Sequence, residues 1–273
     1  KNNKIMDTKK IEFKIGNKDL FVDVLKKFNK FQRSSTDALN NSVFSMLYSD
    51  RMSLNGLTIG RSFLKKSELL YNDFIDDMSG IIDNNIVIGY LNFNKFVNSF
   101  KYLDDQILMS IEYVNNEDDG SMVANRILLS DSNIYLYFDC VDIINFKYSY
   151  FTDDMFINVI DGVNKSLFFE FDLSQENIQM IFNLISLNNS DIIKFNKNDN
   201  NFMVYNDDFE YILCRDQSIL ENFNNFEKGI STSNFLLIDV DDYKLSIGNN
   251  MLLKSVNNNT SIIIAALNYD DYS

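Results

Sequence analysis

Five pairs of adjacent aspartates are the residues of this chain whose type and spacing most resemble catalytic or metal-binding chemistry. They are Asp76-Asp77, Asp118-Asp119, Asp153-Asp154, Asp207-Asp208 and Asp241-Asp242. Neighbouring carboxylates can bind a divalent cation or share acid and base roles. The pairs fall mostly at predicted turns, where aspartate is favoured because its side chain bonds to the local backbone. The pattern therefore favours turns, and we predict no catalytic residue, no metal and no cofactor.

Other common catalytic groups are missing or isolated. The 273 residues contain no histidine, which excludes a Ser-His-Asp triad and a His-ligated zinc site within the chain. Cys140 and Cys214, the only cysteines, lie in strand-like sequence, which indicates buried strand cysteines in a reducing compartment. No segment matches a phosphate-binding loop. We therefore expect a protein that is not an enzyme.

Basic residues gather on two predicted helices. Residues 18–33 form an amphipathic pattern whose apolar stripe is opposite Lys26, Lys27, Lys30 and Arg33. Residues 92–103 repeat the arrangement, with Lys95 and Lys101 on the outer side. A solvated helix face is the ordinary interpretation of such a row. The formal net charge of −14 disfavours nucleic-acid binding only if charge is spread evenly, because phosphate attraction depends on local potential.

The remaining sequence predicts antiparallel strands around these helices. In the first half we expect strands at 42–48, 52–59 with a tight turn at Asn55-Gly56, 106–114, 122–129 and 133–140. In the second half Ser174 is predicted to cap a helix at 175–187. A strand at 166–171 precedes it, and strands at 191–196, 201–205 and 209–215 follow. A segment at 234–239 then leads to a short helix at 241–245 and a closing hairpin over 251–267.

A pattern that occurs twice indicates two similar domains. Phe13, Ile15 and Leu20 have the same spacing as Phe171, Leu173 and Ile178, and Tyr90, Phe93 and Phe96 have the same spacing as Leu237, Val240 and Tyr243. Two weak repeats in the same order are typical of one structural plan used twice. We predict domains at 1–145 and 146–273, with a connector within 141–154.

Composition suggests the origin and location of the protein. Proline, tryptophan and histidine are absent, and asparagine, lysine and isoleucine are abundant, as in the AT-rich genomes of many phages. No segment approaches the roughly 20 apolar residues that cross a bilayer, and residues 1–10 lack the apolar core of a signal peptide. We expect no membrane partner and a cytoplasmic location, in the host cytoplasm if a phage encodes the protein.

The order of strand, helix, meander, short helix and final strands, used twice, resembles a DNA polymerase sliding clamp of the kind found in T-even-type phages and in proliferating cell nuclear antigen. The local matches are Phe171-Asp-Leu-Ser-Gln-Glu-Asn-Ile178, the segment from Asp242 to Leu253, and Leu91-Asn-Phe-Asn-Lys-Phe-Val97. The resemblance implies an α+β DNA-clamp fold that forms a ring. Each of its two domains would pack two helices on antiparallel sheets.

The resemblance also implies a function. Sliding clamps are rings of six similar domains, so a two-domain chain implies a homotrimer, and residues 133–140 and 209–215 are candidate edge strands for ring closure. Such a ring encircles double-stranded DNA without reading its sequence, tethers the DNA polymerase as a processivity factor, and is placed on DNA by a clamp loader. A β-rich phage virion structural protein is the alternative, followed by a carboxylate enzyme that uses a bound metal.

The resemblance assigns two groups of site residues. The DNA-facing residues would be Lys26, Lys27, Lys30, Arg33, Lys95, Lys101 and Lys244. The helix at 175–187 has no basic residue, which leaves the DNA-facing surface of the second domain open. The connector carries an apolar surplus for a partner-binding pocket, formed by Ile143, Ile144, Phe146, Tyr148, Tyr150 and Phe151. Packing of these side chains between the domains is the other interpretation.

Overall fold

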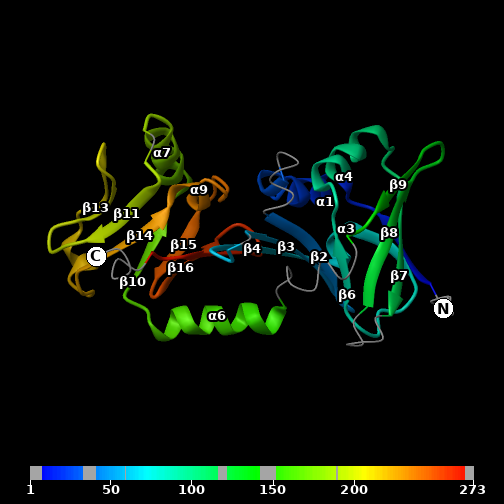
Figure 1. Ribbon diagram of the computed structural model, residues 1–273, viewed down its shortest axis with the longest axis horizontal. Coiled ribbons are helices and arrows are strands. Elements are labelled where there is room, and N and C mark those ends of the chain that lie inside the picture. Colours follow the sequence, from blue (N-terminus) through cyan, green and yellow to red (C-terminus); the bar gives the residue numbers. More distant parts are fainter. Residues whose placement is uncertain are drawn as a thin grey trace, which may run out of the picture. The chain divides into compact units, whose positions relative to one another are not determined.

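A computed structural model describes residues 8–32, 41–58, 60–115, 122–141, 152–188 and 190–267 of the chain. The chain divides into two compact units. Unit 1 comprises Lys1–Ile59 and Lys66–Tyr150, and unit 2 comprises Gly60–Lys65 and Phe151–Ser273. Both combine helices with largely antiparallel sheets (Figure 1), so the α+β fold class predicted from the sequence is confirmed.

Unit 1 is built on one continuous sheet. Its strands run in the order β4-β3-β2-β6-β8-β7-β1-β5, and β9 pairs with β8. The strand pairs β1–β5, β1–β7, β2–β3, β2–β6, β7–β8 and β8–β9 are antiparallel, and β6 pairs with β8 in parallel. The elements are β1 (Lys9–Ile15), α1 (Lys18–Lys26), η1 (Asn29–Gln32), β2 (Asn41–Leu47), β3 (Arg51–Thr58), β4 (Phe63–Leu70), α3 (Tyr71–Phe74), β5 (Ile75–Ser79), β6 (Ile86–Gly89), α4 (Phe93–Ser99), η2 (Phe100–Tyr102), β7 (Ile107–Asn115), β8 (Met122–Ser130) and β9 (Tyr135–Asp139).

Unit 2 contains two separate sheets. One has the order β10-β15-β16-β17, followed by the first residues of β4, and the other has the order β13-β12-β11-β14. The elements are α6 (Asp153–Lys165), β10 (Phe169–Leu173), α7 (Gln175–Ser186), β11 (Ile192–Lys197), β12 (Phe202–Tyr205), β13 (Glu210–Cys214), α8 (Gln217–Leu220), β14 (Phe226–Ser231), α9 (Thr232–Phe235), β15 (Tyr243–Ile247), β16 (Asn250–Ser255) and β17 (Thr260–Ala265).

The two units repeat one topology. The pairs β1·β7, β2·β3, β2·β6, β7·β8 and β8·β9 in unit 1 correspond in order to β10·β15, β11·β12, β11·β14, β15·β16 and β16·β17. Helix α1 then corresponds to α7, and α4 to α9. The first sequence repeat is confirmed, because it spans the end of β1 with α1 and the end of β10 with α7.

Polar caps and buried aromatic rings fix the helices of both units. The side chains of Asn17, Asn92 and Ser174 accept hydrogen bonds from backbone N–H groups in the first turns of α1, α4 and α7, which satisfies donors that a helix end leaves unpaired. The predicted cap at Ser174 is therefore confirmed. The helix expected over 18–33 ends at Lys26 and is followed by η1. Phe28 and Phe31 of its predicted apolar stripe are buried.

Some local predictions are wrong for identifiable reasons. Asn55-Gly56 is not a turn but lies inside β3, where Gly56 faces Val43 of β2. The helix expected at 241–245 is the strand β15, because it pairs with both β10 and β16. The second sequence repeat therefore aligned α4 with the wrong residues. Helix α6 was missed, and the strand expected at 166–171 starts later, at Phe169.

Gly56 provides a test of core packing. A Cβ atom at this position would lie 2.6 Å from the ring of Phe31, which is fully buried, so the ring or the strand must move. We expect Gly56→Ala to lower the free energy of unfolding by about 1–3 kcal/mol, measured by urea denaturation.

Gly162→Ala is the matched control. Gly162 lies inside α6 with no atom within 4 Å of an added Cβ, so alanine should raise the free energy of unfolding by about 0.5–1 kcal/mol through helix propensity. Equal effects of the two changes would contradict this account of Gly56.

Candidate nucleic-acid interface

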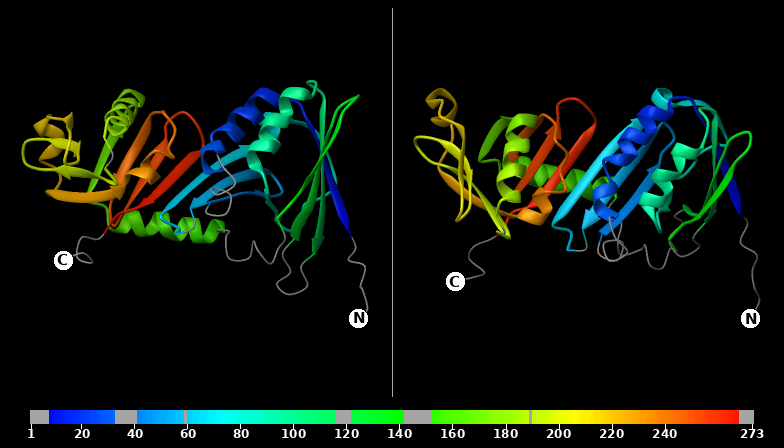
Figure 2. Two further views of the ribbon diagram at one scale, coloured as in Figure 1. Left: turned by 45° about the horizontal axis from the view of Figure 1, so that its top comes forward. Right: turned by 90° about the horizontal axis from the view of Figure 1, so that it is seen from above.

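Helices α1 and α4 lie side by side on the same side of the unit 1 sheet (Figures 1 and 2). Phe21 of α1 stacks on Phe74 at a ring-centre distance of 5.0 Å and meets the edge of Phe100 at 5.6 Å. The Nζ of Lys18 donates a hydrogen bond of 2.6 Å to the carbonyl oxygen of Leu103, just after η2. The aromatic core thus holds α1, α4 and η2 together. Their outer sides, with η1 directly after α1, form one surface, called here the helix face.

The helix face carries five of the seven predicted DNA-facing residues. Lys26, Lys95 and Lys101 are exposed, whereas Lys27 and Lys30 are half-buried. The Nζ of Lys26 lies 3.5 Å from Asp23, and that of Lys101 lies 4.7 Å from the ring centre of Tyr102. Exposed ion pairs of this kind are weak, so Lys26 can exchange its partner for a phosphate.

Of the two remaining predicted residues, the structure describes only Lys244, which is not part of this surface. Arg33 lies outside the described residues. Lys244 belongs to β15 of unit 2, opposite Asp172 of β10, and its Nζ lies 3.5 Å from Glu170. The sequence placed Lys244 on a helix, but strand pairing places it in a sheet.

Acidic residues are distributed unequally over the helix face. Helix α1 exposes Asp19 and Asp23 beside its lysines, and Asp104 and Asp105 follow η2. Between Phe93 and Tyr102, in contrast, the sequence contains lysines and no acid. The local potential should therefore be most positive over α4 and η2. Sequence reasoning missed Lys18, which joins the elements, and Tyr102, whose exposed ring lies among the lysines.

Unit 2 does not repeat this pattern of charge. The exposed polar positions of α7 are Gln175, Glu176, Gln179, Asn183 and Ser186. The amide of Gln179 donates a hydrogen bond of 3.0 Å to Asn183. The helix thus presents neutral hydrogen-bonding groups and one carboxylate. Amides can contact phosphates but supply no long-range attraction.

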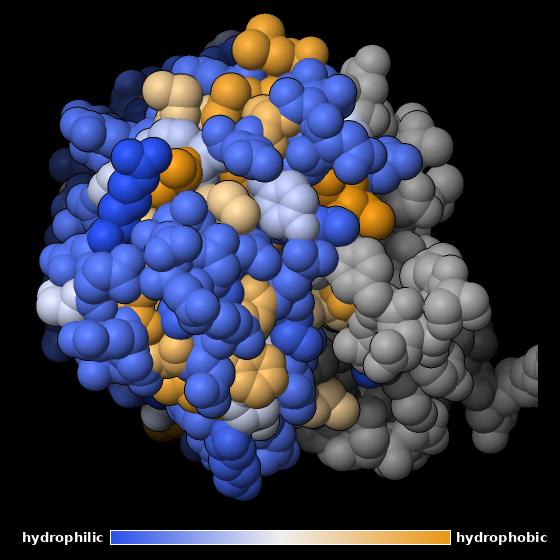
Figure 3. Space-filling model, turned by 90° about the vertical axis from the view of Figure 1, so that its left-hand side faces the viewer, coloured by the Kyte–Doolittle hydropathy of each residue, from blue (hydrophilic) through white to orange (hydrophobic). Residues whose placement is uncertain are grey.

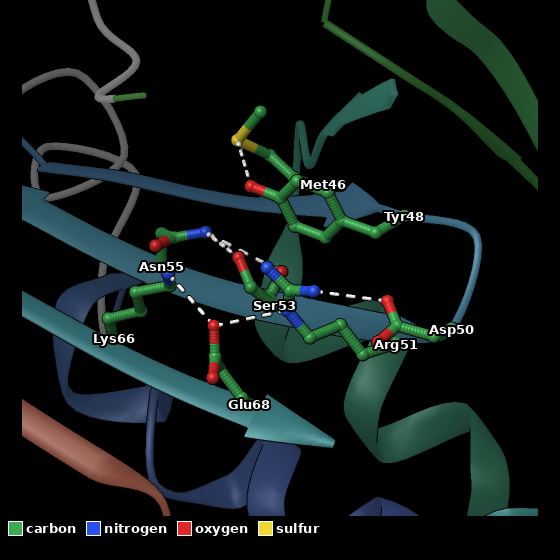
Figure 4. Close-up of polar contacts among 8 residues, drawn as sticks. All are labelled: Met46, Tyr48, Asp50, Arg51, Ser53, Asn55, Lys66 and Glu68. Atoms are coloured by element: carbon green, nitrogen blue, oxygen red, sulfur yellow. Dashed lines mark hydrogen bonds and ion pairs between the residues drawn. The ribbon is translucent and has the colours of Figure 1, made fainter. Parts of the chain in front are cut away.

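Two other cations of unit 1, Arg51 and Lys66, already have anionic partners. In the cluster drawn in Figure 4, the Nε of Arg51 lies 3.3 Å from Glu68 and the Nζ of Lys66 lies 3.0 Å from the same carboxylate oxygen. A second nitrogen of Arg51 bonds to Asp50 at 3.0 Å. The side chain of Lys66 is only 10% exposed, so this cluster stabilises β2, β3 and β4 and is not a phosphate site.

The aspartate pairs mostly serve local structure. Asp207-Asp208 lie at the bend between β12 and β13, as predicted, and Asp241-Asp242 lie between α9 and β15. Asp76-Asp77 are part of β5, and Asp153-Asp154 open α6. Asp118-Asp119 fall outside the described residues. Within the described ranges, no group of three or more His, Cys, Asp or Glu side chains is placed to hold a metal ion.

Asp241 shows what such a carboxylate does. It accepts hydrogen bonds from the side chains of Ser255, Asn257 and Asn258 and from the backbone N–H of Asp242. Partial burial alone raises the pKa of Asp241, but these hydrogen bonds outweigh it and lower the pKa. The carboxylate therefore organises the start of β15 and the β16–β17 turn.

The predicted partner pocket stays a prediction. Ile143, Ile144, Phe146, Tyr148, Tyr150 and Phe151 all lie outside the described residues. The part of the chain that the structure describes contains no helix long and apolar enough to cross a membrane.

Both cysteines are free thiols, and Cys214 is buried at the end of β13. Cys140 is half-buried directly after β9. Burial, with a smaller contribution from the Asp139 carboxylate, raises the pKa of Cys140 to about 12. Only the thiolate reacts readily, so the thiol should be inert at neutral pH.

Alkylation tests the state of Cys140. At pH 8 we expect iodoacetamide to modify Cys140 in the native protein at least tenfold more slowly than in urea, because about one pKa unit corresponds to a tenfold change in thiolate. Peptide mass spectrometry measures both rates. Equal rates would contradict the burial of this thiol.

No protein-family model and no curated protein matches the sequence. Solved structures do match. The beta clamp of Helicobacter pylori bound to a DNA ligase peptide has a TM-score of 0.65 and 12% identity over 98% of this chain and 68% of its own. Proliferating cellular nuclear antigen from Entamoeba histolytica has a TM-score of 0.60 and 13% identity over 94% of this chain and 99% of its own. The nuclear antigen of A. fulgidus, bound to the C-terminal region of FEN-1, has a TM-score of 0.56 and 12% identity over 94% of this chain and 98% of its own.

These similarities cover both units and their duplicated topology. The chain matches almost the full length of the two nuclear antigens but about two thirds of the beta clamp. The fold predicted from the sequence resemblance is confirmed: the chain has the fold of the DNA polymerase sliding clamps.

Proposed function

We propose that the protein is a DNA polymerase processivity factor, a sliding clamp that closes around double-stranded DNA as a homotrimer. The observation that carries the proposal is the fold similarity to sliding clamps over 94–98% of the chain. The matched structures bind a ligase peptide and the C-terminal region of FEN-1. By analogy, we propose that this chain is a scaffold without an enzymatic activity, and that its partners are a polymerase and a clamp loader.

Subunit length supports a trimer. The chain has two copies of the repeated topology, and it spans almost the full length of the nuclear-antigen chains. Three such chains would make a ring of six copies. The phage origin and the cytoplasmic location remain predictions from the sequence.

Two strand edges supply a way to close the ring. β9 pairs along its length with β8, and β13 pairs with β12. Pairing β13 of one subunit with β9 of the next would satisfy both edges, and closure of the ring would leave neither exposed.

The surface around β13 is suited to a subunit interface formed by backbone hydrogen bonds. Figure 3 views unit 2 from the end at which β13 lies in Figure 1 and shows a mostly hydrophilic surface with scattered apolar patches. Such a surface lacks the broad apolar area of many permanent interfaces. Strand pairing would then contribute a large share of the association free energy.

The helix face would line the hole of the ring. Its lysines can attract phosphates without reading base sequence. Topology keeps a closed ring on DNA, so a few weakly paired cations suffice. On this proposal Lys26, Lys27, Lys30, Lys95 and Lys101 contact DNA, whereas α7 contributes neutral amides.

A proline in β9 tests ring closure. The N–H of Cys140 donates to the carbonyl oxygen of Asn125 in β8, and the N–H of Asp131 donates to the carbonyl oxygen of Ile134 at the same hairpin. In β9 the backbone N–H and C=O groups of even-numbered residues therefore face β8, and those of Tyr137 face the open edge. Tyr137→Pro removes an outward N–H and spares the β8 pairing, as edge strands tolerate. We expect a folded monomer where the wild type is a trimer, measured by analytical ultracentrifugation.

Tyr137→Ala is the control, because it removes the same side chain but keeps the N–H and should remain trimeric. A wild-type protein that is monomeric at every concentration would contradict the ring. Open-ended assembly would instead favour a virion structural protein.

Charge reversal tests the helix face. Changing Lys26, Lys30, Lys95 and Lys101 to Glu makes the net charge of each subunit eight units more negative. It removes no buried apolar side chain. Surface changes of this kind usually alter folding by less than about 0.5 kcal/mol per site, so the trimer should persist. Loading onto primed DNA and processive synthesis should be lost, most strongly at low salt, where screening is weakest.

The matched control reverses four exposed lysines outside the helix face, Lys9, Lys14, Lys165 and Lys254, and so has the same net charge. We expect it to retain processivity. If both quadruple variants behave alike, net charge and not the helix face governs DNA association.

A further inference from the structure

In each unit one sheet has an outer face that points away from the aromatic core. In unit 2 the rings of Phe169 and Phe171 contact that of Phe202 in the second sheet. Because successive side chains of a strand alternate between faces, Glu170 belongs to the outer face. Strand register extends a row from Glu170 across β15, β16 and β17. The row comprises Glu170, Ser246, Leu252 and Ile263.

Helix α6 covers this row in unit 2. It packs on β15 and β16, on the side of their sheet away from α7 (Figure 1). Phe156 and Val163, seven residues apart on one side of α6, are buried. Beneath the helix Leu252 is 1% exposed and Ile263 is 6% exposed. An amphipathic helix therefore buries the apolar end of the row.

Unit 1 repeats the row residue by residue. The sequence repeat that aligns Phe13 with Phe171 also aligns Glu12 with Glu170. Strand register leads from Glu12 across β7, β8 and β9. The row comprises Glu12, Ser110, Leu128 and Tyr137. Both rows thus read glutamate, serine and leucine in the same order, and they differ only in the last strand, where tyrosine replaces isoleucine.

The row of unit 1 is exposed where the row of unit 2 is covered. Tyr137 is 62% exposed and Leu128 is half-buried. In the adjacent row Leu108 and Tyr135, which both lie opposite Ser130, are 38% and 62% exposed. The side chains of Leu108, Leu128, Tyr135 and Tyr137 are called here the outer patch. Contiguous exposed apolar and aromatic surface is typical of interaction sites.

The rim of the outer patch carries balanced charge. On one side Lys14 lies between Leu108 and Asp77 in the sheet. On the other side the Nε of Arg126 lies 3.3 Å from Asp139. Net charge therefore does not select the occupant. The apolar match does, and the second copy of the topology shows which element fits such a row.

We propose that the outer patch binds an amphipathic helix of a partner protein, seated across β7 and β8 as α6 is seated on β15 and β16. Apolar side chains seven residues apart on that helix would contact the patch, and its polar side would face solvent. Strand pairing at the open edge of β9 uses backbone groups and leaves these side chains available. The inference goes beyond the proposed function and does not depend on DNA binding or on ring formation.

A peptide with the sequence of residues 152–166 is the probe, because it contains the helix that covers the equivalent row. Short helices are marginal in water, so a hydrocarbon link should join positions 158 and 162, whose side chains are exposed in α6. Fluorescence anisotropy of the labelled peptide with the full chain should show saturable binding at micromolar concentration. A peptide with Phe156 and Val163 replaced by Glu should not bind. Absence of binding by the first peptide would overturn the proposal.

Leu108→Glu tests the location of the site. A carboxylate under the docked helix loses water without gaining a partner, so we expect binding to weaken at least about tenfold. Leu167→Glu is the matched control, since Leu167 is 39% exposed but lies in unit 2, and it should bind as the wild type does. Unchanged binding by Leu108→Glu would show that the peptide only displaces α6 and would overturn the site.

Tyr135→Ser is a second variant at a more exposed position, and it should weaken binding even if Leu108→Glu disturbs folding. Circular dichroism of each variant checks that the fold is intact. Analytical ultracentrifugation without peptide identifies the occupant. If Leu108→Glu lowers the oligomeric mass of the protein, a second copy of the chain covers the patch, and the assignment to a partner helix is overturned.

Discussion

The structure depends on one constraint: the backbone N–H and C=O groups along the edge of a sheet need partners, and a duplicated topology leaves the same edges open in each copy. In this chain β9 pairs with β8 and β13 pairs with β12, and the other edge of each strand can accept a strand from another chain. Two copies of one topology therefore present strand edges that can pair with each other. On the proposed function, pairing of these edges between subunits of a closed ring would supply the missing partners.

The lysines of the helix face are brought together by the packing of the helices, which overall composition does not reveal. The aromatic contacts of Phe21 with Phe74 and Phe100 bring α1, α4 and η2 onto one surface. The net charge of −14 says nothing about that surface. Two cations elsewhere in unit 1, Arg51 and Lys66, are paired with the carboxylates of Asp50 and Glu68. On the helix face Lys26 has only an exposed and therefore weak ion pair, so a strongly acidic protein can still present a local site for phosphates.

Sequence reasoning reached the class of the fold because its strongest signals are local. The strand-to-helix junctions at Phe13–Leu20 and Phe171–Ile178, and the cap at Ser174, depend on residues within one or two turns. The helix at 241–245 was wrong because Tyr243 and Leu245 gain their partners from β10 and β16, which are distant in sequence. Lys244 was misplaced for the same reason. The buried Lys197 donates a hydrogen bond to the carbonyl oxygen of Phe223, and no spacing in the sequence indicates that contact.

The parallel pairing of β6 with β8 has a consequence for how each unit opens. It joins the strands of unit 1 into one hydrogen-bonded sheet, whereas the described strands of unit 2 form two sheets that meet through side chains and the single bridge between Gly229 and Leu267. Opening unit 1 must break a continuous ladder, but the four-stranded sheet of unit 2 can separate along a seam. We therefore expect the amides of β11 to β14 to exchange with solvent deuterium by a partial opening, at a lower free energy than global unfolding.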